Sequence, residues 1–272
     1  MGMEAFRYDG KHALVVGGAS GMGQATGDLV KELGGTVTVM DVKEPLGAHD
    51  RFIPLDLVDK DSIDAALDQL DGPVHALFSC AGISGGPLLP QINFIGQRHL
   101  LESALDRGLL PKGASIAMIA SIGGMGWEYE LDAIGEMLDT PDYETAVKWI
   151  EVNPDRNDYS FFKRVMIAYC GRQAPDLMNR GIRINATAPG PTMTPLMAAT
   201  EGWQGFETGF QAMMGRPGSS AAEQAYPLVF LASDAASFVS GTCLIVDAGF
   251  VGGGMTGALE GPMVDALLKR KT

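Results

Sequence analysis

Short apolar runs alternate with helix-length segments along most of this 272-residue chain, and the alternation constrains the fold more than any other feature. Expected strands cover His12–Val16, Thr36–Met40, Arg51–Leu55, Val74–Ser79, Ala114–Ala120, Ile182–Ala186 and Thr242–Val246. Expected helices lie at Gly21–Leu33, about 60–70, about 91–107, about 158–179 and 221–232. This order predicts right-handed crossovers and a parallel sheet with helices on both faces. We therefore expect one Rossmann-type, doubly wound α/β domain over residues 1–272, with about seven parallel strands.

Charge and cysteine content narrow the possible partners. The formal net charge is −13, and residues 128–158 contain ten carboxylates but only two cations. An acidic surface disfavours nucleic acid and anionic membranes. No apolar run is long enough to span a bilayer, and the first residues lack the apolar core of a signal peptide. Three scattered cysteines suit neither a disulfide framework nor a metal site, so we expect a cytoplasmic protein.

A glycine-rich turn follows the first expected strand and opens the first helix. The spacing of Gly17, Gly21 and Gly23 lets the backbone approach a pyrophosphate, which the free N–H groups of the helix N-terminus then bind. Asp41 closes the second strand about twenty residues later. A carboxylate there accepts hydrogen bonds from an adenosine ribose and repels a 2′-phosphate, which favours NAD over NADP. A plain strand-end turn is the alternative for Asp41, and Lys43 lies nearby.

Tyr159 and Lys163 lie four residues apart, on one face of an expected helix. An ammonium beside a phenol favours the phenolate, so we expect Lys163 to lower the pKa of Tyr159 and make it a proton donor or acceptor. The spacing alone is common on helices, where it usually marks a solvated lysine beside a half-buried tyrosine. The surrounding motifs decide between these interpretations.

Seven motifs in order resemble those of the short-chain dehydrogenase/reductase family. They are the Gly17/Gly21/Gly23 loop, Ser79-Cys80-Ala81-Gly82, Asn93, Ser121, the Tyr159/Lys163 pair, Pro189-Gly190 with Thr192 and Thr194, and Gly241-Thr242 with Asp247-Ala248-Gly249. The resemblance implies that Tyr159 is the general acid/base and that Ser121 holds the substrate oxygen. It also implies that Lys163 holds the nicotinamide ribose and that Asn93 positions a water linking Lys163 to solvent.

The resemblance also implies a set of cofactor-binding residues. They are Gly17, Ser20, Gly21, Met22, Gly23, Asp41, Asp56, Leu57, Ala81, Gly82, Tyr159, Lys163, Pro189, Gly190, Thr192 and Thr194. Two positions depart from the family pattern. Val16 replaces a threonine, and Ser79-Cys80 replaces an asparagine pair whose amides steady the central strand. Both changes are expected to loosen cofactor positioning.

Ser121 and Tyr159 are separated by 38 residues, where the family ordinarily has about a dozen. We expect the insertion, residues 122–158, to form two short acidic amphipathic helices, the second with Thr140 as N-cap and Pro141 at its first position. A similar insertion is characteristic of a subgroup that contains bacterial 3α-hydroxysteroid dehydrogenase/carbonyl reductases and coniferyl-alcohol-type dehydrogenases, where it alters a helix-packed subunit interface. A solvated extension is the alternative. A homodimer or homotetramer is expected from the family.

The loop after Pro189 is rich in methionine and aromatic residues, and we expect a substrate lid over about 191–218. The predicted substrate pocket contains Met125, Trp127, Met193, Met197 and Trp203. These features favour an NAD-dependent oxidoreductase for a hydrophobic secondary alcohol or ketone, such as a hydroxysteroid, terpenoid or aryl alcohol. Two alternatives stay open: a nicotinamide-binding regulatory protein without turnover, and an NAD-using epimerase or dehydratase.

Overall fold

The computed structural model describes residues 2–200 and 202–268, and its centre is a parallel sheet of seven strands. The spatial order is β3-β2-β1-β4-β5-β6-β9, which confirms the predicted doubly wound fold. The strands are β1 (His12–Val16), β2 (Thr36–Asp41), β3 (Arg51–Pro54), β4 (Ala76–Ser79), β5 (Ser115–Ile119), β6 (Arg183–Pro189) and β9 (Cys243–Val246). All seven overlap the predicted strands, and β6 runs three residues further than expected.

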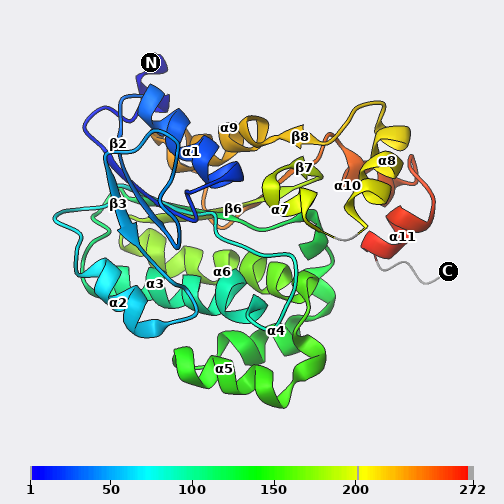
Figure 1. Ribbon diagram of the computed structural model, residues 1–272, viewed down its shortest axis with the longest axis horizontal. Coiled ribbons are helices and arrows are strands. Elements are labelled where there is room, and N and C mark those ends of the chain that lie inside the picture. Colours follow the sequence, from blue (N-terminus) through cyan, green and yellow to red (C-terminus); the bar gives the residue numbers. More distant parts are fainter. Residues whose placement is uncertain (1, 201, 269–272) are drawn as a thin grey trace.

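Helices cover both faces of the sheet because alternate strand residues point to opposite sides. Val15 of β1 packs with Leu228 and Val229 of α9 (Ala221–Ala232), on the face that also carries α1 (Gly21–Glu32). Leu14 packs on the other face, in one core cluster with Phe162 of α6. That face carries α2 (Lys60–Leu67), α3 (Gly96–Asp106) and α6 (Tyr159–Asn179). The two helical layers lie above and below the sheet in Figure 1.

The strand order reverses between β1 and β4, because β2 lies on one side of β1 and β4 on the other. In open parallel sheets, ligands bind at the carboxyl ends of the strands beside this switch point. The segments that follow β1, β4, β5 and β6 all leave the sheet at this edge. The topology therefore collects the glycine loop, Ala81-Gly82, Ser121 and Gly190 along one side of the molecule.

The insertion forms the two predicted acidic helices, α4 (Leu131–Leu138) and α5 (Tyr143–Val152). They add a third layer beyond α3 and α6 in Figure 1. Two buried arginines attach it. Arg98 of α3 donates to the Thr140 carbonyl and hydroxyl at 2.7 and 3.0 Å, and Arg164 of α6 donates to both Glu130 carboxylate oxygens at 3.0 Å. The insertion is thus packed against the domain, and the alternative of a merely solvated extension does not hold.

The predicted N-cap of α5 was wrong. Asp142 caps the helix by accepting from the Thr145 N–H at 2.7 Å. Thr140 instead donates its hydroxyl to the Met137 carbonyl and accepts from Arg98. An aspartate directly before the first helical residue caps a helix as well as a threonine does. Thr140 does not cap because its hydroxyl and carbonyl accept hydrogen bonds from the buried Arg98 guanidinium.

The lid region follows β6 and consists of β7 (Thr192–Met193), α7 (Pro195–Ala198), α8 (Trp203–Met214) and β8 (Ser219–Ser220). Residue 201 of the predicted lid lies outside the described residues. Two further helices, α10 (Phe250–Thr256) and α11 (Pro262–Leu268), pack on α8 through Phe210, Phe250 and Val264. Short helical turns occupy Met3–Phe6, Gln91–Ile95, Ile122–Gly124, Trp127–Tyr129, Pro154–Arg156 and Asp234–Ala236. Within 2–200 and 202–268, no helix combines the length and apolarity needed to cross a membrane.

Candidate active site

The glycine loop is as tight as its sequence predicts. A Cβ on Gly17, which has φ of +80°, would lie 2.4 Å from the Ala81 nitrogen, and a Cβ on Gly23 would lie 2.1 Å from the Gly17 carbonyl oxygen. Neither position tolerates a side chain. α1 begins at Gly21, so the loop leads directly into a helix N-terminus with free N–H groups. This cradle fits the pyrophosphate of a dinucleotide.

Asp41 lies against the glycine loop. Its carboxylate accepts from the Ala19 N–H at 2.9 Å and from the Lys43 N–H at 3.1 Å, so its orientation is fixed beside the turn. This position suits a carboxylate that meets the ribose next to the pyrophosphate. Asp56 is exposed and accepts from the Val58 N–H at 2.9 Å, whereas the Leu57 side chain lies in the core. Only backbone atoms of Leu57 are therefore available to a cofactor.

Asn93 and Lys163 both lie next to Gly82, in the segment that follows β4. Asn93 is fully buried in the π-helical turn Gln91–Ile95, and its side chain bonds both the N–H and the carbonyl of Ile83, at 2.8 and 2.9 Å. A Cβ on Gly82 would lie 3.5 Å from Asn93 Oδ1 and 3.8 Å from Lys163 Nζ. The structure thus brings these two predicted catalytic residues to the same side of one glycine.

Tyr159 is the first residue of α6 because Asp158 caps that helix, accepting from the Phe161 N–H at 2.9 Å. Lys163 follows one turn later, with Nζ 5.5 Å from the centre of the Tyr159 ring. Ser121 follows β5 and lies beside Tyr159, because a Cβ built on Gly123 would be 3.5 Å from Ser121 Oγ and 3.6 Å from Tyr159 Cε1. The three side chains, from two distant parts of the sequence, therefore converge as predicted.

The electrostatics differ from the prediction. Burial raises the pKa of Tyr159, and only the Ser121 hydrogen bond opposes that rise. Burial also lowers the pKa of Lys163, to about 8, and its ammonium donates to the Ile119 carbonyl at 2.8 Å. The prediction that Lys163 lowers the pKa of Tyr159 is therefore wrong in this structure, because the ammonium lies under the ring and is bound to a backbone carbonyl.

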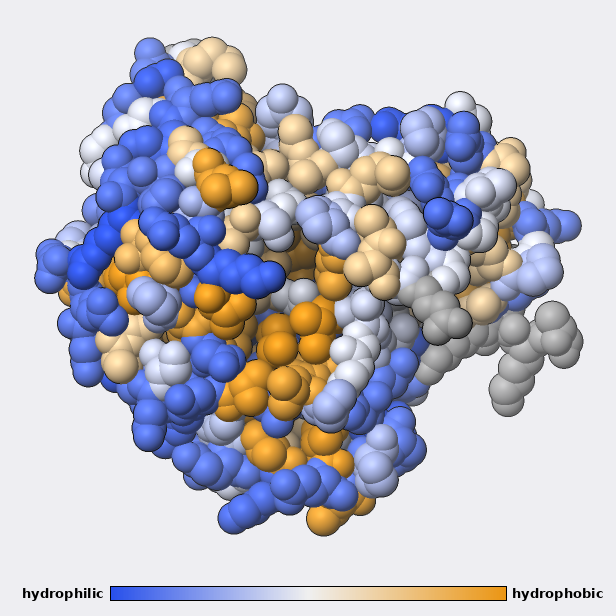
Figure 2. Space-filling model, viewed as in Figure 1, coloured by the Kyte–Doolittle hydropathy of each residue, from blue (hydrophilic) through white to orange (hydrophobic). Residues whose placement is uncertain are grey.

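A cavity of about 460 Å³ opens beside Ser121, Tyr159 and Lys163. Figure 2 shows apolar surface gathered around a hollow near the centre of one face of the molecule. Nine predicted cofactor residues line the cavity: Met22, Ala81, Gly82, Tyr159, Lys163, Pro189, Gly190, Thr192 and Thr194. Gly17, Ser20, Gly21, Gly23, Asp41, Asp56 and Leu57 lie outside it. The cavity therefore contains the residues predicted for the nicotinamide end of the site, whereas those predicted for the adenosine end lie outside it.

The substrate-pocket prediction is only partly matched. Met197 and Trp203 line the cavity, but Met125, Trp127 and Met193 do not. Met125 and Trp127 pack against the hydrophobic core instead, because the insertion turns the chain away from the cavity after Ser121. Met193 is 50% exposed. The lining also contains Leu196 and Phe206, which belong to the predicted lid. Sequence reasoning missed Leu267, which comes from α11 and which nothing in the sequence pattern indicated.

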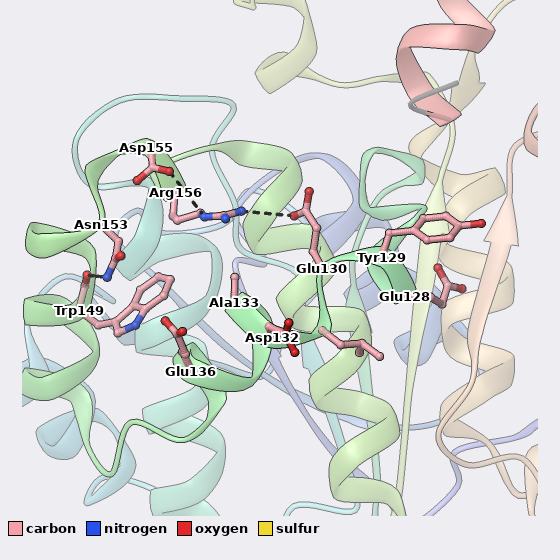
Figure 3. Close-up of a pocket in the computed structure, with 11 residues that line it drawn as sticks. Glu128, Tyr129, Glu130, Asp132, Ala133, Glu136, Trp149, Asn153, Asp155 and Arg156 are labelled. Carbon is pink, nitrogen blue, oxygen red and sulfur yellow. Dashed lines mark hydrogen bonds and ion pairs between the residues drawn. The ribbon is translucent and has the colours of Figure 1, made fainter. Parts of the chain in front are cut away.

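A second cavity, of about 590 Å³, lies within the insertion, between α4 and the end of α5. Figure 3 shows Glu136 beside Trp149, and Arg156 between Glu130 and Asp155. None of the four predicted catalytic residues lines it. Across the part of the chain that the structure describes, no group of histidine, cysteine and carboxylate side chains is arranged to hold a metal ion.

Comparison with known proteins agrees with this geometry. A family model described as enoyl-(acyl carrier protein) reductase matches residues 145–251. Coniferyl-alcohol dehydrogenase of Pseudomonas sp. (strain HR199) is 28% identical over 88% of this chain and 96% of its own length. A 2,5-dichloro-2,5-cyclohexadiene-1,4-diol dehydrogenase of Sphingobium indicum (strain B90A) is also 28% identical, over 89% and 97%.

Among solved structures, too, the chain is similar to a dehydrogenase. The 3-alpha-hydroxysteroid dehydrogenase from Pseudomonas sp. B-0831, crystallised with NADH, is 26% identical, with a TM-score of 0.75 over 92% of this chain and 100% of that one. The chain therefore resembles the short-chain dehydrogenase/reductase family of oxidoreductases in its fold, in the order of its motifs and in the geometry of its site, and one of the solved relatives was crystallised with NADH.

Proposed function

We propose that the protein is an NAD-dependent oxidoreductase that interconverts a secondary alcohol and the corresponding ketone on a hydrophobic small molecule. The observation that carries the proposal is the convergence of Ser121, Tyr159 and Lys163 on one cavity whose walls also contain the Gly190–Thr194 loop. The alcohol dehydrogenase and hydroxysteroid dehydrogenase among the relatives support the same reaction class. A bound nicotinamide supplies or accepts the hydride; proton handling and orientation belong to the protein.

The residues divide this work by position. The Ser121 hydroxyl, which lines the same cavity as the phenol, holds the substrate oxygen beside Tyr159 Oη. In the reducing direction Tyr159 donates its proton to that oxygen, and in the oxidising direction it removes the hydroxyl proton. Because burial raises the pKa of Tyr159, the phenol is protonated at neutral pH and ready to act as the acid. Lys163 Nζ, held below the ring, lies beside Gly82 at the wall where a nicotinamide ribose would sit.

The cavity lining supports a substrate that is apolar and uncharged. The lining includes the apolar side chains of Met197, Trp203, Phe206 and Leu267. Lys163 is the one ionic side chain in the lining within the described residues, and it is almost fully buried. A charged substrate group would therefore lose its hydration there without gaining a partner. Flat aromatic and flexible methionine side chains suit a ring system such as a steroid, terpenoid or aryl alcohol.

The cofactor preference rests on Asp41. A fixed carboxylate beside the loop accepts hydrogen bonds from a ribose diol and repels a 2′-phosphate, so we propose NAD rather than NADP. Fluorescence titration of the purified protein should give a lower Kd for NADH than for NADPH. The opposite order would remove this role for Asp41.

A spectrophotometric screen tests the activity. The protein is mixed with NAD and a panel of neutral hydroxysteroids, terpenols and benzylic alcohols, and formation of NADH is followed by absorbance. We expect turnover with at least one ring-bearing alcohol and weaker turnover with the matched carboxylic acid derivative. Tight NADH binding without turnover of any alcohol, or of any ketone in the reverse assay, would favour a nicotinamide-binding regulatory protein.

A further inference from the structure

A buried amide outside the four predicted catalytic residues holds the segment after β4. Gln97 lies in the first turn of α3 and is 1% exposed. Its Nε2 donates to the Ala81 carbonyl at 2.9 Å and to the Ile92 carbonyl at 2.7 Å, and its Oε1 accepts from the Ser79 hydroxyl. Both amide hydrogens and the amide oxygen are therefore engaged, which fixes the side chain in one orientation.

The Ala81 carbonyl belongs to a wall of the proposed active site. Ala81 and Gly82 line the cavity, and Gly17 of the glycine loop lies so close to Ala81 that a Cβ would meet its nitrogen at 2.4 Å. Asn93 holds the next residue, Ile83, through both its N–H and its carbonyl. Residues 81–83 are thus fixed at one end by Gln97 and at the other by Asn93. A shift at Ala81 would move the glycine loop and the wall beside Lys163 together.

We propose that Gln97 is a positioning residue for the reaction described above, acting through the Ala81 carbonyl without contacting substrate. The inference rests on the proposed function. Ser79 completes the arrangement, because its hydroxyl occupies the Gln97 oxygen and keeps both amide hydrogens directed at carbonyls. Ser79 and Gln97 together also explain why the sequence can depart from the family pattern at position 79. Ser79 stands where the family pattern has an asparagine, and the Gln97 amide supplies hydrogen bonds from the neighbouring helix.

Two variants remove this arrangement to different degrees. Gln97→Met keeps an unbranched side chain of similar length but loses all three hydrogen bonds, whereas Ser79→Ala loses only the one to Oε1. Ser115→Ala is the matched control. Ser115 is buried in β5, where it pairs with Ala76 of β4. Its hydroxyl donates one hydrogen bond to the Ala232 carbonyl of α9 at 2.6 Å, and neither residue lines the cavity. Each protein is assayed for melting temperature, NADH Kd, kcat and the alcohol KM.

We expect Gln97→Met to lower kcat by about 10- to 100-fold, because small displacements of a reactive geometry cost that much. NADH Kd should rise, while the alcohol KM stays within about twofold, since the lid that contacts the alcohol is untouched. Ser79→Ala should show a smaller change of the same kind. The double variant should be no worse than Gln97→Met alone, because both changes remove one network. Ser115→Ala should lose melting temperature but keep the wild-type kcat.

The outcomes distinguish a failure of the Gln97 role from a failure of the proposed function. A folded Gln97→Met with wild-type kcat and NADH Kd would overturn the positioning role. If Gln97→Met does not fold, Ser79→Ala decides: a fall in melting temperature with no change in kcat or NADH Kd, as in Ser115→Ala, overturns the role equally. A wild-type protein that neither binds NADH nor turns over any alcohol would defeat the proposed function itself, independently of Gln97.

Discussion

The buried charge of Lys163 should lower the free energy of unfolding, although the residue is needed at the site. Replacing it with a neutral side chain should therefore raise the free energy of unfolding. The residue is 3% exposed, and burial lowers its pKa from 10.5 to about 8. Each tenfold change in an ionisation equilibrium is worth about 1.4 kcal/mol, so burying the charged form costs about 3 kcal/mol at neutral pH. Lys163→Met removes that cost but also the hydrogen bond to the Ile119 carbonyl, worth about 1 kcal/mol. The variant should be more stable by about 2 kcal/mol at pH 7.

The sign of the pH dependence follows from linkage. Between about pH 8 and 10.5 the unfolded chain holds the lysine proton and the folded chain has released it. The unfolded state then binds more protons, so the free energy of unfolding rises with pH through this window. Above 10.5 the lysine is neutral in both states and its charge costs nothing. The advantage of Lys163→Met should therefore be largest below pH 8 and vanish as the pH approaches 10.5.

Urea denaturation of wild type and variant without cofactor, at pH 7 and pH 10, measures the difference directly and cancels contributions from other titrating groups. Lys148→Met, which removes an exposed lysine on α5, is the control and should change stability by less than about 0.5 kcal/mol. A Lys163→Met protein that is less stable than wild type at pH 7, or a difference that does not shrink by pH 10, would refute the reasoning. Turnover should be lost in either case.

Three other substitutions test separate parts of the site. Asp41→Ala should raise the NADH Kd by about 10- to 100-fold and narrow the preference over NADPH, because a charge-assisted hydrogen bond to the ribose is lost; titration with both cofactors measures this. Trp203→Ala should raise the KM of a ring-bearing alcohol by about tenfold in steady-state assays while leaving NADH Kd unchanged. Arg164→Met leaves the Glu130 carboxylate with fewer partners and should lower unfolding free energy by about 1–3 kcal/mol in urea titrations. If the measured value does not change in one of these variants, the role given to that residue is wrong.

The sheet could be predicted from sequence because each β-strand is a short apolar run bounded by glycine or a helix signal. The site could be predicted as far as it follows strand ends: Gly17 after β1, Ser121 after β5 and Tyr159 at a helix start are local features. Parallel topology then brings them together without further information. This is why residues far apart in the chain were correctly grouped.

The failures concern contacts that depend on the tertiary arrangement. Spacing placed Lys163 beside Tyr159, but it could not show that the ammonium bonds the Ile119 carbonyl and that burial dominates both pKa shifts. Met125 looked like a pocket residue by proximity to Ser121, yet the insertion turns it toward the core. The Gln97 network was invisible for the same reason, because its partners belong to β4 and to the turn before α3.

The proton-transfer role of Tyr159 is the centre of this account, and one comparison tests it most directly. With NAD and an alcohol identified in the screen, kcat is measured for wild type, Tyr159→Phe and the control Tyr129→Phe, which alters an exposed tyrosine of the insertion. Tyr159→Phe should reduce kcat by about 10²- to 10⁴-fold with an NADH Kd close to that of wild type, while Tyr129→Phe remains fully active. A Tyr159→Phe enzyme with wild-type kcat would contradict the account.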